Sequence, residues 1–289
     1  MQNMLLVDAG ATKTEFVMLN VQGDAKHFFS NGINPNYLTD NEILQIFNDA
    51  LQSVSDMNLG SIRQLAYYGA GCASLSNVRR MVDLLATLFP GADICVYSDL
   101  MAVCHALCHS HSGQVAILGT GSASCFYDGH DMVQRAPSLG YLLGDEGSGT
   151  DLGKRLLAAY LDDRLPSNLA TQFRNTYHLT TEIILHKLYQ ESNPNLFMSS
   201  LAPFLLEYSS NPMMYKMAYE AFSVFLKRLT SFYSHAADYN WYFSGSVAYN
   251  FRAIFCEAAS AQGLTIDRIV ASPMPDLIDY YKNSLLCNK

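Results

Sequence analysis

Two short segments with the same pattern, about 110 residues apart, constrain the fold of this chain most strongly. In each, an apolar strand-like run enters a turn rich in glycine and threonine and continues into a second strand-like run; the segments are residues 4–20 and 115–127. Such self-similarity indicates that a whole domain is repeated. We therefore predict two related domains, residues 1–112 and 113–289, with a hinge near Ser110–Gly113.

The remaining pattern alternates between strands and helices, which is typical of an α/β architecture. In the first half, strands are expected at residues 4–8, 14–20, 25–30, 64–68 and 93–97. Helices are expected there at 40–54, 76–89 and 99–109. In the second half, residues 150–239 are expected to be mostly helical, with helices at 151–162, 196–208 and 213–237. The last predicted elements are strands at 241–243 and 266–270 and a helix at 247–261.

The composition excludes several classes of protein. A chain that is 49% hydrophobic and 15% charged is not a disordered tail. With 18 Lys and Arg against 26 Asp and Glu, and no basic stripe, a nucleic-acid partner is not expected. No run of about 20 apolar residues and no export signal is found, so a membrane partner is not expected either. The 7 cysteines, several in apolar runs, indicate a reducing, cytoplasmic location.

The two small-residue turns are the first candidates for chemistry. In residues 8–14 (D-A-G-A-T-K-T), a carboxylate ends a strand and the turn that follows offers backbone amides to a phosphate. Asp8 could hold a hydrated Mg²⁺, which needs only one or two protein carboxylates. Residues 118–124 (L-G-T-G-S-A-S) form an equivalent turn in the second half. Neither turn fits a dinucleotide-binding fingerprint, because a strand and not a helix follows.

Three further segments carry candidate residues, each with a simpler structural interpretation. Asp145 and Glu146 lie between glycines just before a helix, where an acidic turn would also favour the helix dipole. Asp99 begins a helix after a strand, a position where Ser98 and Asp99 could serve only as caps. Residues 243–248 (F-S-G-S-V-A) run from a strand through glycine into a helix, as ordinary turns between strand and helix also do.

Together these segments resemble the sugar kinase, Hsp70 and actin superfamily. The G-D-E-G-S-G segment at 144–149 and the S-D-L-M-A-V-C-H-A-L segment at 98–107 look like the N-acetylglucosamine kinase branch, grouped with BadF/BadG/BcrA/BcrD-type ATPases. The resemblance spans residues 4 to about 281 and is weakest over 165–235. It implies two ribonuclease H-like, actin-like ATPase domains with a cleft between them, a mostly helical insertion in the second, and a last helix that packs back on the first.

The resemblance also assigns roles to individual residues. The first phosphate motif comprises Asp8, Gly10, Ala11, Thr12, Lys13 and Thr14, with Asp8 positioning Mg²⁺ through water. The second phosphate motif comprises Gly119, Thr120, Gly121 and Ser122, and the adenosine motif Gly245, Ser246 and Val247. Asp99 matches the catalytic base and a substrate ligand; the other sugar ligands are Asn34, Gly140, Asp145 and Glu146. The implied reaction is phosphorylation of an amino sugar by ATP and Mg²⁺, with N-acetylglucosamine and its 6-hydroxyl favoured.

Other interpretations stay open. Leu139 and Ala123 replace a Trp and an Asn of the animal N-acetylglucosamine kinases, so glucosamine or another hexose is an alternative substrate. A BadF-type ATPase that activates a partner enzyme is a second function, and a sensor without turnover is a third. Cys104, His105, Cys108, His109 and His111 could form a metal cluster, although buried structural thiols explain the helical spacing of the cysteines better. A homodimer is expected, with the aromatic stretch 208–242 as core or dimer surface.

Overall fold

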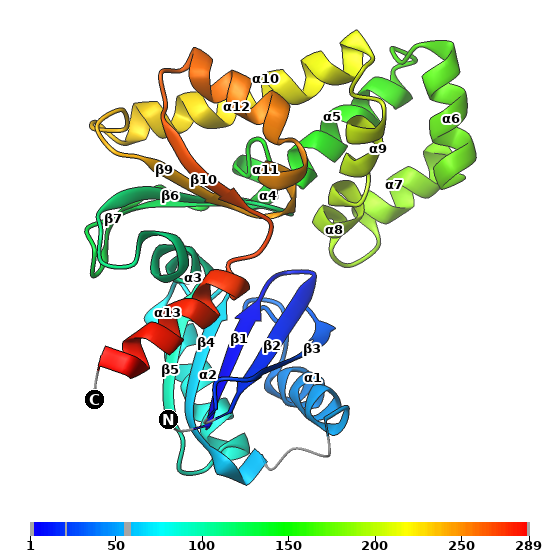
Figure 1. Cartoon of the computed structure of the whole chain (residues 1–289). Helices are drawn as coiled ribbons and strands as arrows, with labels where there is room; N and C mark the ends of the chain where they lie inside the picture. Colours follow the sequence, from blue (N-terminus) through cyan, green and yellow to red (C-terminus); the bar gives the residue numbers. More distant parts are fainter. Residues whose placement is uncertain (1–2, 21, 55–58, 288–289) are drawn as a thin grey trace. The chain divides into compact units, whose positions relative to one another are not determined.

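The structure is a computed structural model that describes residues 3–20, 22–54 and 59–287 (Figure 1). It divides the chain into two compact units. Unit 1 contains Met1–His109 together with Pro273–Lys289, and unit 2 contains Ser110–Ser272. Each unit has its own five-stranded sheet and its own hydrophobic core. The predicted α/β class with two domains is therefore confirmed.

Unit 1 is built on a mixed sheet. Its strands are β1 (Asn3–Ala9), β2 (Lys13–Leu19), β3 (Ala25–Asn31), β4 (Ile62–Gly69) and β5 (Asp93–Ser98). The order in the sheet is β3-β2-β1-β4-β5, with β1 to β3 antiparallel and β4 and β5 parallel to β1. Because the carboxyl ends of β1, β4 and β5 lie at one edge of the sheet, the residues that follow these three strands come together there.

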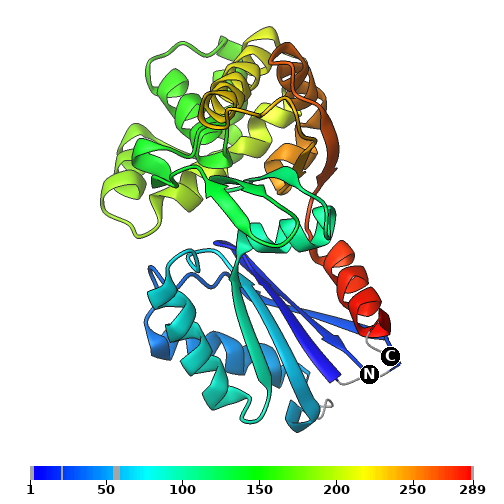
Figure 2. The same ribbon diagram turned by 90° about the vertical axis from the view of Figure 1, so that its left-hand side faces the viewer.

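Helices cover both faces of this sheet (Figures 1 and 2). They are α1 (Asp40–Gln52), α2 (Leu75–Leu88), α3 (Asp99–Val103), the π-helical turn η2 (Cys104–Cys108) and α13 (Met274–Cys287), with a short 3₁₀ turn η1 (Leu59–Ser61) before β4. Side chains alternate along a strand. Leu5, Val7 and Ala9 of β1 join the core under α1 and α2, so Asp8 lies on the opposite face, where α3 begins.

The chain returns to unit 1 at its end. The prediction divided the chain after residue 112 and assigned 113–289 to the second domain, whereas the division lies after His109 and Pro273–Lys289 belong to unit 1. The imidazole of His105 stacks on Tyr280 of α13 with centroids 4.9 Å apart. The Tyr281 hydroxyl lies 2.8 Å from that of Tyr68 on β4. These aromatic and polar contacts attach the last helix to the first sheet.

Unit 2 repeats the sheet of unit 1. Its strands are β6 (Gly113–Leu118), β7 (Ser122–Tyr127), β8 (Met132–Arg135), β9 (Trp241–Ser244) and β10 (Ile266–Val270). Their order is β10-β9-β6-β7-β8, again with three antiparallel strands followed by two parallel ones. The repeat inferred from the two hairpins is thus a repeat of the whole sheet. β8, which corresponds to β3, was not predicted.

Helices make up most of the rest of unit 2. They are α4 (Gly140–Leu143), α5 (Gly149–Leu161), α6 (Ser167–Tyr177), α7 (Thr181–Tyr189), α8 (Pro194–Ser199), α9 (Ala202–Glu207), α10 (Pro212–Phe232), α11 (Ser246–Asn250) and α12 (Arg252–Ala261). The segment from α6 to α9 lies between α5 and α10 and forms the predicted helical insertion. Figure 1 shows it as the helices labelled α6 to α9, coloured from green to yellow-green.

Three predicted helices differ from those observed. The helix expected at 196–208 is divided into α8 and α9, with a proline near the start of each. The helix expected at 213–237 ends at Phe232, because Tyr233 turns inward and its hydroxyl bonds to Ser124 Oγ and to the Ala136 amide, each at 3.0 Å. The helix expected at 247–261 is interrupted at Phe251, between α11 and α12.

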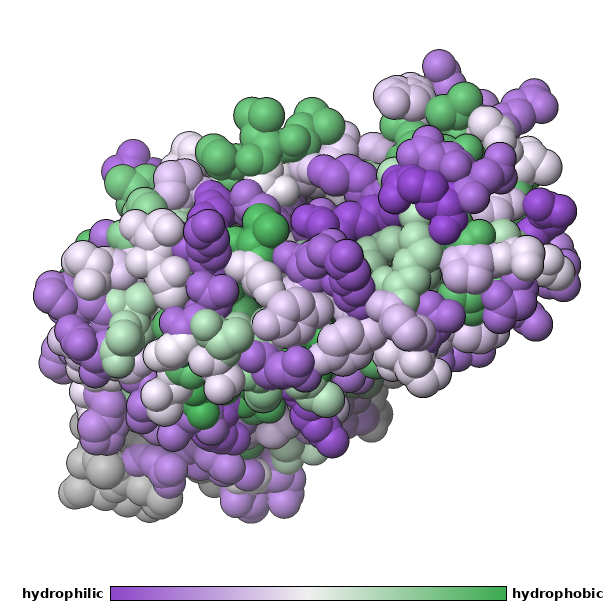
Figure 3. Space-filling view, turned by 90° about the horizontal axis from the view of Figure 1, so that it is seen from above, coloured by the Kyte–Doolittle hydropathy of each residue, from purple (hydrophilic) through white to green (hydrophobic). Residues whose placement is uncertain are grey.

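None of the helices in the described ranges combines the length and the apolar character that crossing a bilayer requires. On the face shown in Figure 3, hydrophilic residues predominate and the hydrophobic ones form small separate groups.

Candidate functional site

The first phosphate motif forms a tight turn between β1 and β2. The Gly10 N–H donates to the Lys13 carbonyl over 3.0 Å and closes the turn. The next loop packs directly on it, because the Gly32 N–H donates to the Thr12 carbonyl over 3.1 Å. A Cβ on Gly32 would lie 2.4 Å from the Ala11 carbonyl carbon, so only glycine permits this approach. Ala11, Thr12 and Lys13 are exposed.

The side chains at the end of this turn have contrasting surroundings. The Lys13 ammonium lies 3.7 Å from the centroid of the Phe29 ring, an exposed cation–π contact. Thr14 is fully buried, and its hydroxyl has no hydrogen-bond partner among the described residues. The Tyr67 hydroxyl is also buried and has no hydrogen-bond partner among the described residues. Buried hydroxyls without partners are rare, because they lose their hydrogen bonds to water without replacement.

The pKa of Asp8 is strongly perturbed. Burial, joined by the negative charges of Asp99 and Glu15, raises the pKa of Asp8 to about 7. Asp99 also acts on Cys72, whose thiol pKa is raised to about 12 by burial and by that charge. The predicted metal ligand and the predicted base therefore lie in one electrostatic cluster at the carboxyl edge of the sheet. Cys72 stays a neutral thiol at physiological pH.

Asp99 begins α3 directly after β5. Its carboxylate accepts the Leu100 N–H over 2.9 Å, so the first amide of the helix orients one of its oxygens. Ser98 occupies the N-cap position but makes no capping hydrogen bond with its side chain. Of the two caps considered for this segment, Ser98 makes no capping hydrogen bond with its side chain, whereas Asp99 does bind an amide of the first turn.

The predicted sugar ligand Asn34 lies in the loop between β3 and α1. Its Oδ1 accepts the Asn36 N–H over 3.0 Å, and its carbonyl accepts the amides of Tyr37 and Leu38, each over 3.1 Å. The side chain lies against the turn after β4, where a Cβ on Gly71 would come within 2.3 Å of Asn34 Oδ1. Asn34 is thus held at the same edge of the sheet as Asp8 and Asp99.

In unit 2, the second phosphate motif is linked to the start of α5. The Gly149 amide donates to the Gly119 carbonyl over 2.8 Å, and the Thr150 amide donates to the Thr120 carbonyl over 3.2 Å. The Thr150 hydroxyl donates to the same carbonyl over 2.7 Å. Within the turn, the Gly119 N–H donates to the Gly121 carbonyl over 3.0 Å. This turn between β6 and β7 is therefore rigidly supported.

Asp145 connects that turn to the acidic segment. Its backbone has a φ of 58°, a left-handed conformation uncommon outside glycine. Its Oδ1 accepts the Ser122 N–H over 2.9 Å, and a Cβ on Gly121 would lie 3.0 Å from the same oxygen. Burial raises the pKa of Asp145 above its usual range, although the Ser122 N–H opposes that shift. A predicted sugar ligand thus contacts the predicted phosphate turn.

Glu146 is held by an arginine that sequence analysis did not identify. Arg228 Nη1 donates to Glu146 Oε2 over 2.5 Å, and Arg228 Nη2 donates to the Pro137 carbonyl over 2.6 Å. Because Arg228 lies on α10, 82 residues further along the chain, no local pattern signals the pairing. Gly140, another predicted sugar ligand, begins α4 in this segment with a φ of 67°.

The predicted adenosine motif lies beside the second phosphate motif. Gly245 has a φ of 118°, and a Cβ there would lie 2.5 Å from the Leu118 carbonyl oxygen and 3.2 Å from the Gly119 amide. Its N–H donates to the Val270 carbonyl over 3.0 Å. Ser246 is exposed, whereas Val247 is buried in the hydrophobic core. The structure therefore brings Gly245 to Gly119, as it brings Asp145 to Gly121 and Ser122.

Cys104, His105 and Cys108 of the cysteine and histidine cluster lie in the π-helical turn η2. Cys104, His105 and Cys108 are all buried. Over residues 3–20, 22–54 and 59–287, no group of three or more His, Cys, Asp or Glu side chains could hold a metal ion. His105 Nδ1 instead lies 2.7 Å from the Tyr68 hydroxyl. Buried thiols, the interpretation favoured from the helical spacing, agree with these positions.

Comparisons with known proteins place this site in context. No protein-family model matches the chain, and a search of curated proteins finds no match. Among solved structures, a putative N-acetylglucosamine kinase from Porphyromonas gingivalis is 33% identical, with a TM-score of 0.91, over 97% of this chain and 99% of that one. A putative N-acetylglucosamine kinase from Chromobacterium violaceum is 16% identical, with a TM-score of 0.75, over 97% and 99%.

A ROK family glucokinase from Streptomyces griseus, solved with glucose and AMPPNP, is 14% identical, with a TM-score of 0.58, over 96% of this chain and 97% of that one. The similarities at 16% and 14% identity show the fold, which is that of the two-domain, actin-like ATPases. The similarity at 33% identity extends over nearly the whole of both chains. The chain therefore belongs to the N-acetylglucosamine kinase-like family of sugar kinases within the actin-like ATPase superfamily.

Proposed function

We propose that this chain transfers the γ-phosphoryl group of ATP to a hydroxyl of an amino sugar, with N-acetylglucosamine as the first candidate and its 6-hydroxyl as the acceptor. The observation that carries the proposal is the cluster of Asp8 and Asp99, in which the charge of one carboxylate raises the pKa of the other. The relative at 33% identity, a putative N-acetylglucosamine kinase, supports the choice of sugar.

In this reaction Asp99 is the general base. The sugar hydroxyl gives its proton to the Asp99 carboxylate while its oxygen attacks the γ-phosphorus, and the bond to the bridging oxygen breaks to release ADP. One Asp99 oxygen is oriented by the Leu100 N–H, so the carboxylate has a defined direction before substrate arrives. A positioned base of this kind contributes roughly 10²- to 10⁴-fold to a rate.

Asp8 is the residue that would hold Mg²⁺. A carboxyl group whose pKa is raised to about 7 by burial and by two neighbouring acids is poorly placed for ionisation unless a cation compensates the charge. Mg²⁺ binds through one or two carboxylates and retains waters, so the lack of a larger ligand set among the described residues fits it. When bound, the ion would neutralise charge on the β- and γ-phosphates.

Backbone amides, rather than basic side chains, would bind the phosphates. The turn of Gly119–Ser122 is supported from α5, and the turn of Gly10–Lys13 is closed by its own hydrogen bond. Gly245 lies beside Gly119, a suitable place for the nucleoside. This arrangement explains how a chain with a net charge of −8 could bind ATP.

The sugar would be bound by amide and carboxylate groups. Asn34 lies near Asp99 in unit 1. In unit 2, Asp145 is half-buried and Glu146 is ion-paired with Arg228. Leu139, which is 51% exposed just before α4, is available to contact an acyl substituent. Glucosamine and other hexoses stay alternatives because no side chain here is specific to an acetamido group.

A coupled assay of ADP release tests the proposal. Purified chain with ATP and Mg²⁺ is supplied in turn with N-acetylglucosamine, N-acetylmannosamine, glucosamine and glucose. We expect ADP release to require sugar, to be fastest with N-acetylglucosamine, and to stop when EDTA removes Mg²⁺. Mass spectrometry and ³¹P NMR of the product would identify the phosphorylated hydroxyl.

ATP turnover that is unchanged by every sugar would contradict the proposal and favour the partner-activating ATPase. Binding of ATP and sugar without turnover would favour a sensor. The proposal includes a cytoplasmic homodimer. Cysteines that form no disulfide suit a reducing compartment, and this holds for Cys72, Cys95, Cys104, Cys108, Cys125 and Cys256. Sedimentation of the purified chain tests the dimer.

A further inference from the structure

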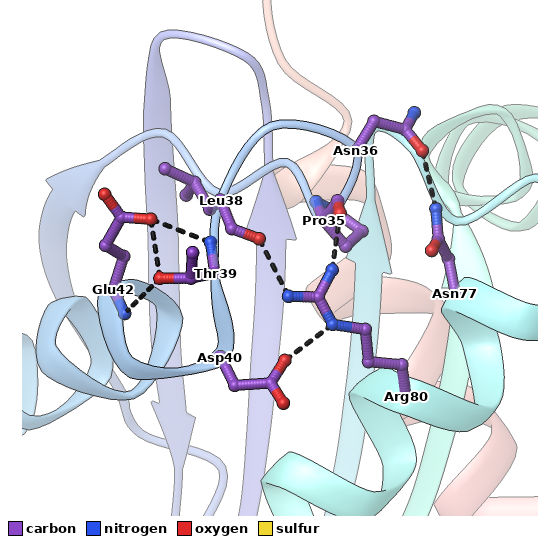
Figure 4. Close-up of polar contacts among 8 residues, drawn as sticks. All are labelled: Pro35, Asn36, Leu38, Thr39, Asp40, Glu42, Asn77 and Arg80. Atoms are coloured by element: carbon purple, nitrogen blue, oxygen red, sulfur yellow. Dashed lines mark hydrogen bonds and ion pairs between the residues drawn. The ribbon is translucent and has the colours of Figure 1, made fainter.

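The loop that carries Asn34 is fastened to α2 by two side chains, Arg80 and Asn77 (Figure 4). These residues lie three positions apart, so they project from the same side of the helix. Neither belongs to any motif identified in the sequence. Both side chains bind groups of the loop between β3 and α1. This loop begins at Gly32 and ends at Thr39, the N-cap of α1.

Arg80 contacts three separate points of this loop. Its Nη1 donates to the Pro35 carbonyl over 2.5 Å, and its Nη2 donates to the Leu38 carbonyl over 2.7 Å. Its Nε donates to Asp40 Oδ1, at the start of α1, over 2.6 Å. Figure 4 shows the guanidinium between these acceptors. The guanidinium binds each acceptor with a different nitrogen of a rigid plane, whereas a lysine ammonium carries all its donors on one nitrogen.

Asn77 connects the loop to the turn after β4. Its Nδ2 donates to Asn36 Oδ1 over 2.7 Å and to the Gly71 carbonyl over 2.8 Å. Gly71 is the residue against which Asn34 packs. The next residue, Cys72, lies within the electrostatic influence of Asp99. The loop, the helix and the catalytic edge of the sheet are therefore joined by one set of hydrogen bonds.

This network leaves Asn34 oriented and able to bind a ligand. Its Oδ1 is occupied by the Asn36 amide. Its amide nitrogen donates no hydrogen bond within the part of the chain that the structure describes. A side-chain amide that is fixed through its oxygen presents its N–H groups in a defined direction, as recognition of a hydroxyl requires.

We propose that Arg80 and Asn77 are positioning residues for the sugar: they hold the 34–40 loop so that Asn34 donates to a substrate hydroxyl in register with Asp99. This inference rests on the proposed function. It states that sugar affinity depends on the three-point geometry of the Arg80 guanidinium rather than on its charge.

The test compares Arg80→Lys and Asn77→Ala with Arg79→Ala, a control on the same helix whose side chain is exposed. Steady-state kinetics with N-acetylglucosamine and ATP are measured for each variant. For Arg80→Lys we expect the KM for sugar to rise about 10-fold, equivalent to the loss of one good hydrogen bond. The KM for ATP should change less than about 2-fold, and Asn77→Ala should show a smaller change in the same direction.

Hydrogen exchange of the ligand-free protein provides a readout independent of activity. Peptides covering 33–40 should exchange faster in Arg80→Lys than in Arg79→Ala, while peptides from β1 should be unchanged. If the wild type is active and Arg80→Lys has the same KM for sugar as the wild type, the inference is overturned and the proposed function is left intact. Equal rises in the KM for sugar and for ATP would also overturn it, as they indicate general damage. A wild type inactive with every sugar would overturn both.

Discussion

The buried histidine of unit 1 gives a prediction about pH and stability. His105 lies between the rings of Tyr280 and Tyr97 and within 2.7 Å of the Tyr68 hydroxyl. Burial lowers the pKa of His105 to about 4. In the unfolded chain the imidazole has its ordinary pKa of about 6.5. Between these two values the unfolded state binds a proton that the folded state does not, so stability falls as the pH falls.

The size of this effect follows from the two pKa values. Between pH 7.5 and pH 5, the free energy of unfolding should decrease by about 2 kcal/mol because of His105 alone. Asp8 acts in the opposite direction, since its pKa is raised to about 7 in the folded state. The contribution of Asp8 to the free energy of unfolding is greatest at low pH and is lost as the pH rises through about 7. Between pH 5 and pH 7.5 this loss amounts to about 2 kcal/mol. The two effects nearly cancel in the wild type.

The assay therefore compares the wild type with His105→Gln, which keeps a polar side chain but does not titrate. Urea unfolding is followed at pH 7.5 and pH 5, without nucleotide or Mg²⁺. Circular dichroism is the suitable probe, because the single tryptophan, Trp241, lies in unit 2 and would not report on unit 1. His105→Gln itself lowers the free energy of unfolding at both pH values. The informative quantity is therefore how the difference in this free energy between wild type and variant changes from pH 7.5 to pH 5.

We expect the wild type to lose about 2 kcal/mol relative to His105→Gln on going from pH 7.5 to pH 5. A difference in stability that is the same at both pH values would refute the reasoning, because it would mean that the folded protein binds a proton at His105 normally.

Three substitutions test other contacts. In Gly153→Ala the new Cβ would lie 1.8 Å from the Met198 carbonyl oxygen, so thermal unfolding should show a loss of about 2 kcal/mol or more. In Gly245→Ala the Cβ would collide with the Leu118 carbonyl at a positive φ, and calorimetry should show AMPPNP affinity reduced at least about 10-fold. Arg228→Lys cannot bind both of its present acceptors, so the KM for sugar should rise while that for ATP stays nearly unchanged. The three expectations would be contradicted by an unaltered melting temperature of Gly153→Ala, an unaltered AMPPNP affinity of Gly245→Ala and an unaltered KM for sugar of Arg228→Lys.

Local patterns in the sequence predicted the elements that position the site. The apolar runs on either side of the turn at 8–14, and those on either side of the small-residue turn at 119–122, identified the two hairpins and hence the repeated sheet. Because parallel strands bring their carboxyl ends to one edge, Asp99 after β5 could be placed near Asp8 without a structure. These inferences depend on periodicity within about ten residues, which a single sequence contains.

The remaining features depend on contacts between distant residues. Arg80 and Arg228 each bind backbone carbonyls 40 or more residues away, and backbone acceptors leave no pattern in a sequence. The helix after Asp99 continues as a π-helical turn over Cys104–Cys108. In this turn His105 packs against Tyr280 of α13. The apolar pattern of the sequence fits a regular α-helix equally well, so it could not indicate the π-helical turn.

The central claim is that Asp99 removes the proton from the sugar hydroxyl. The most direct test is the sugar-dependent rate of ADP release by Asp99→Asn, beside Asp93→Asn, an exposed aspartate at the start of the same strand. The account predicts that kcat falls by roughly 10²- to 10⁴-fold in Asp99→Asn. The melting temperature should still rise when N-acetylglucosamine is added, and Asp93→Asn should match the wild type. An Asp99→Asn protein that binds the sugar and turns over at the wild-type rate would contradict the account.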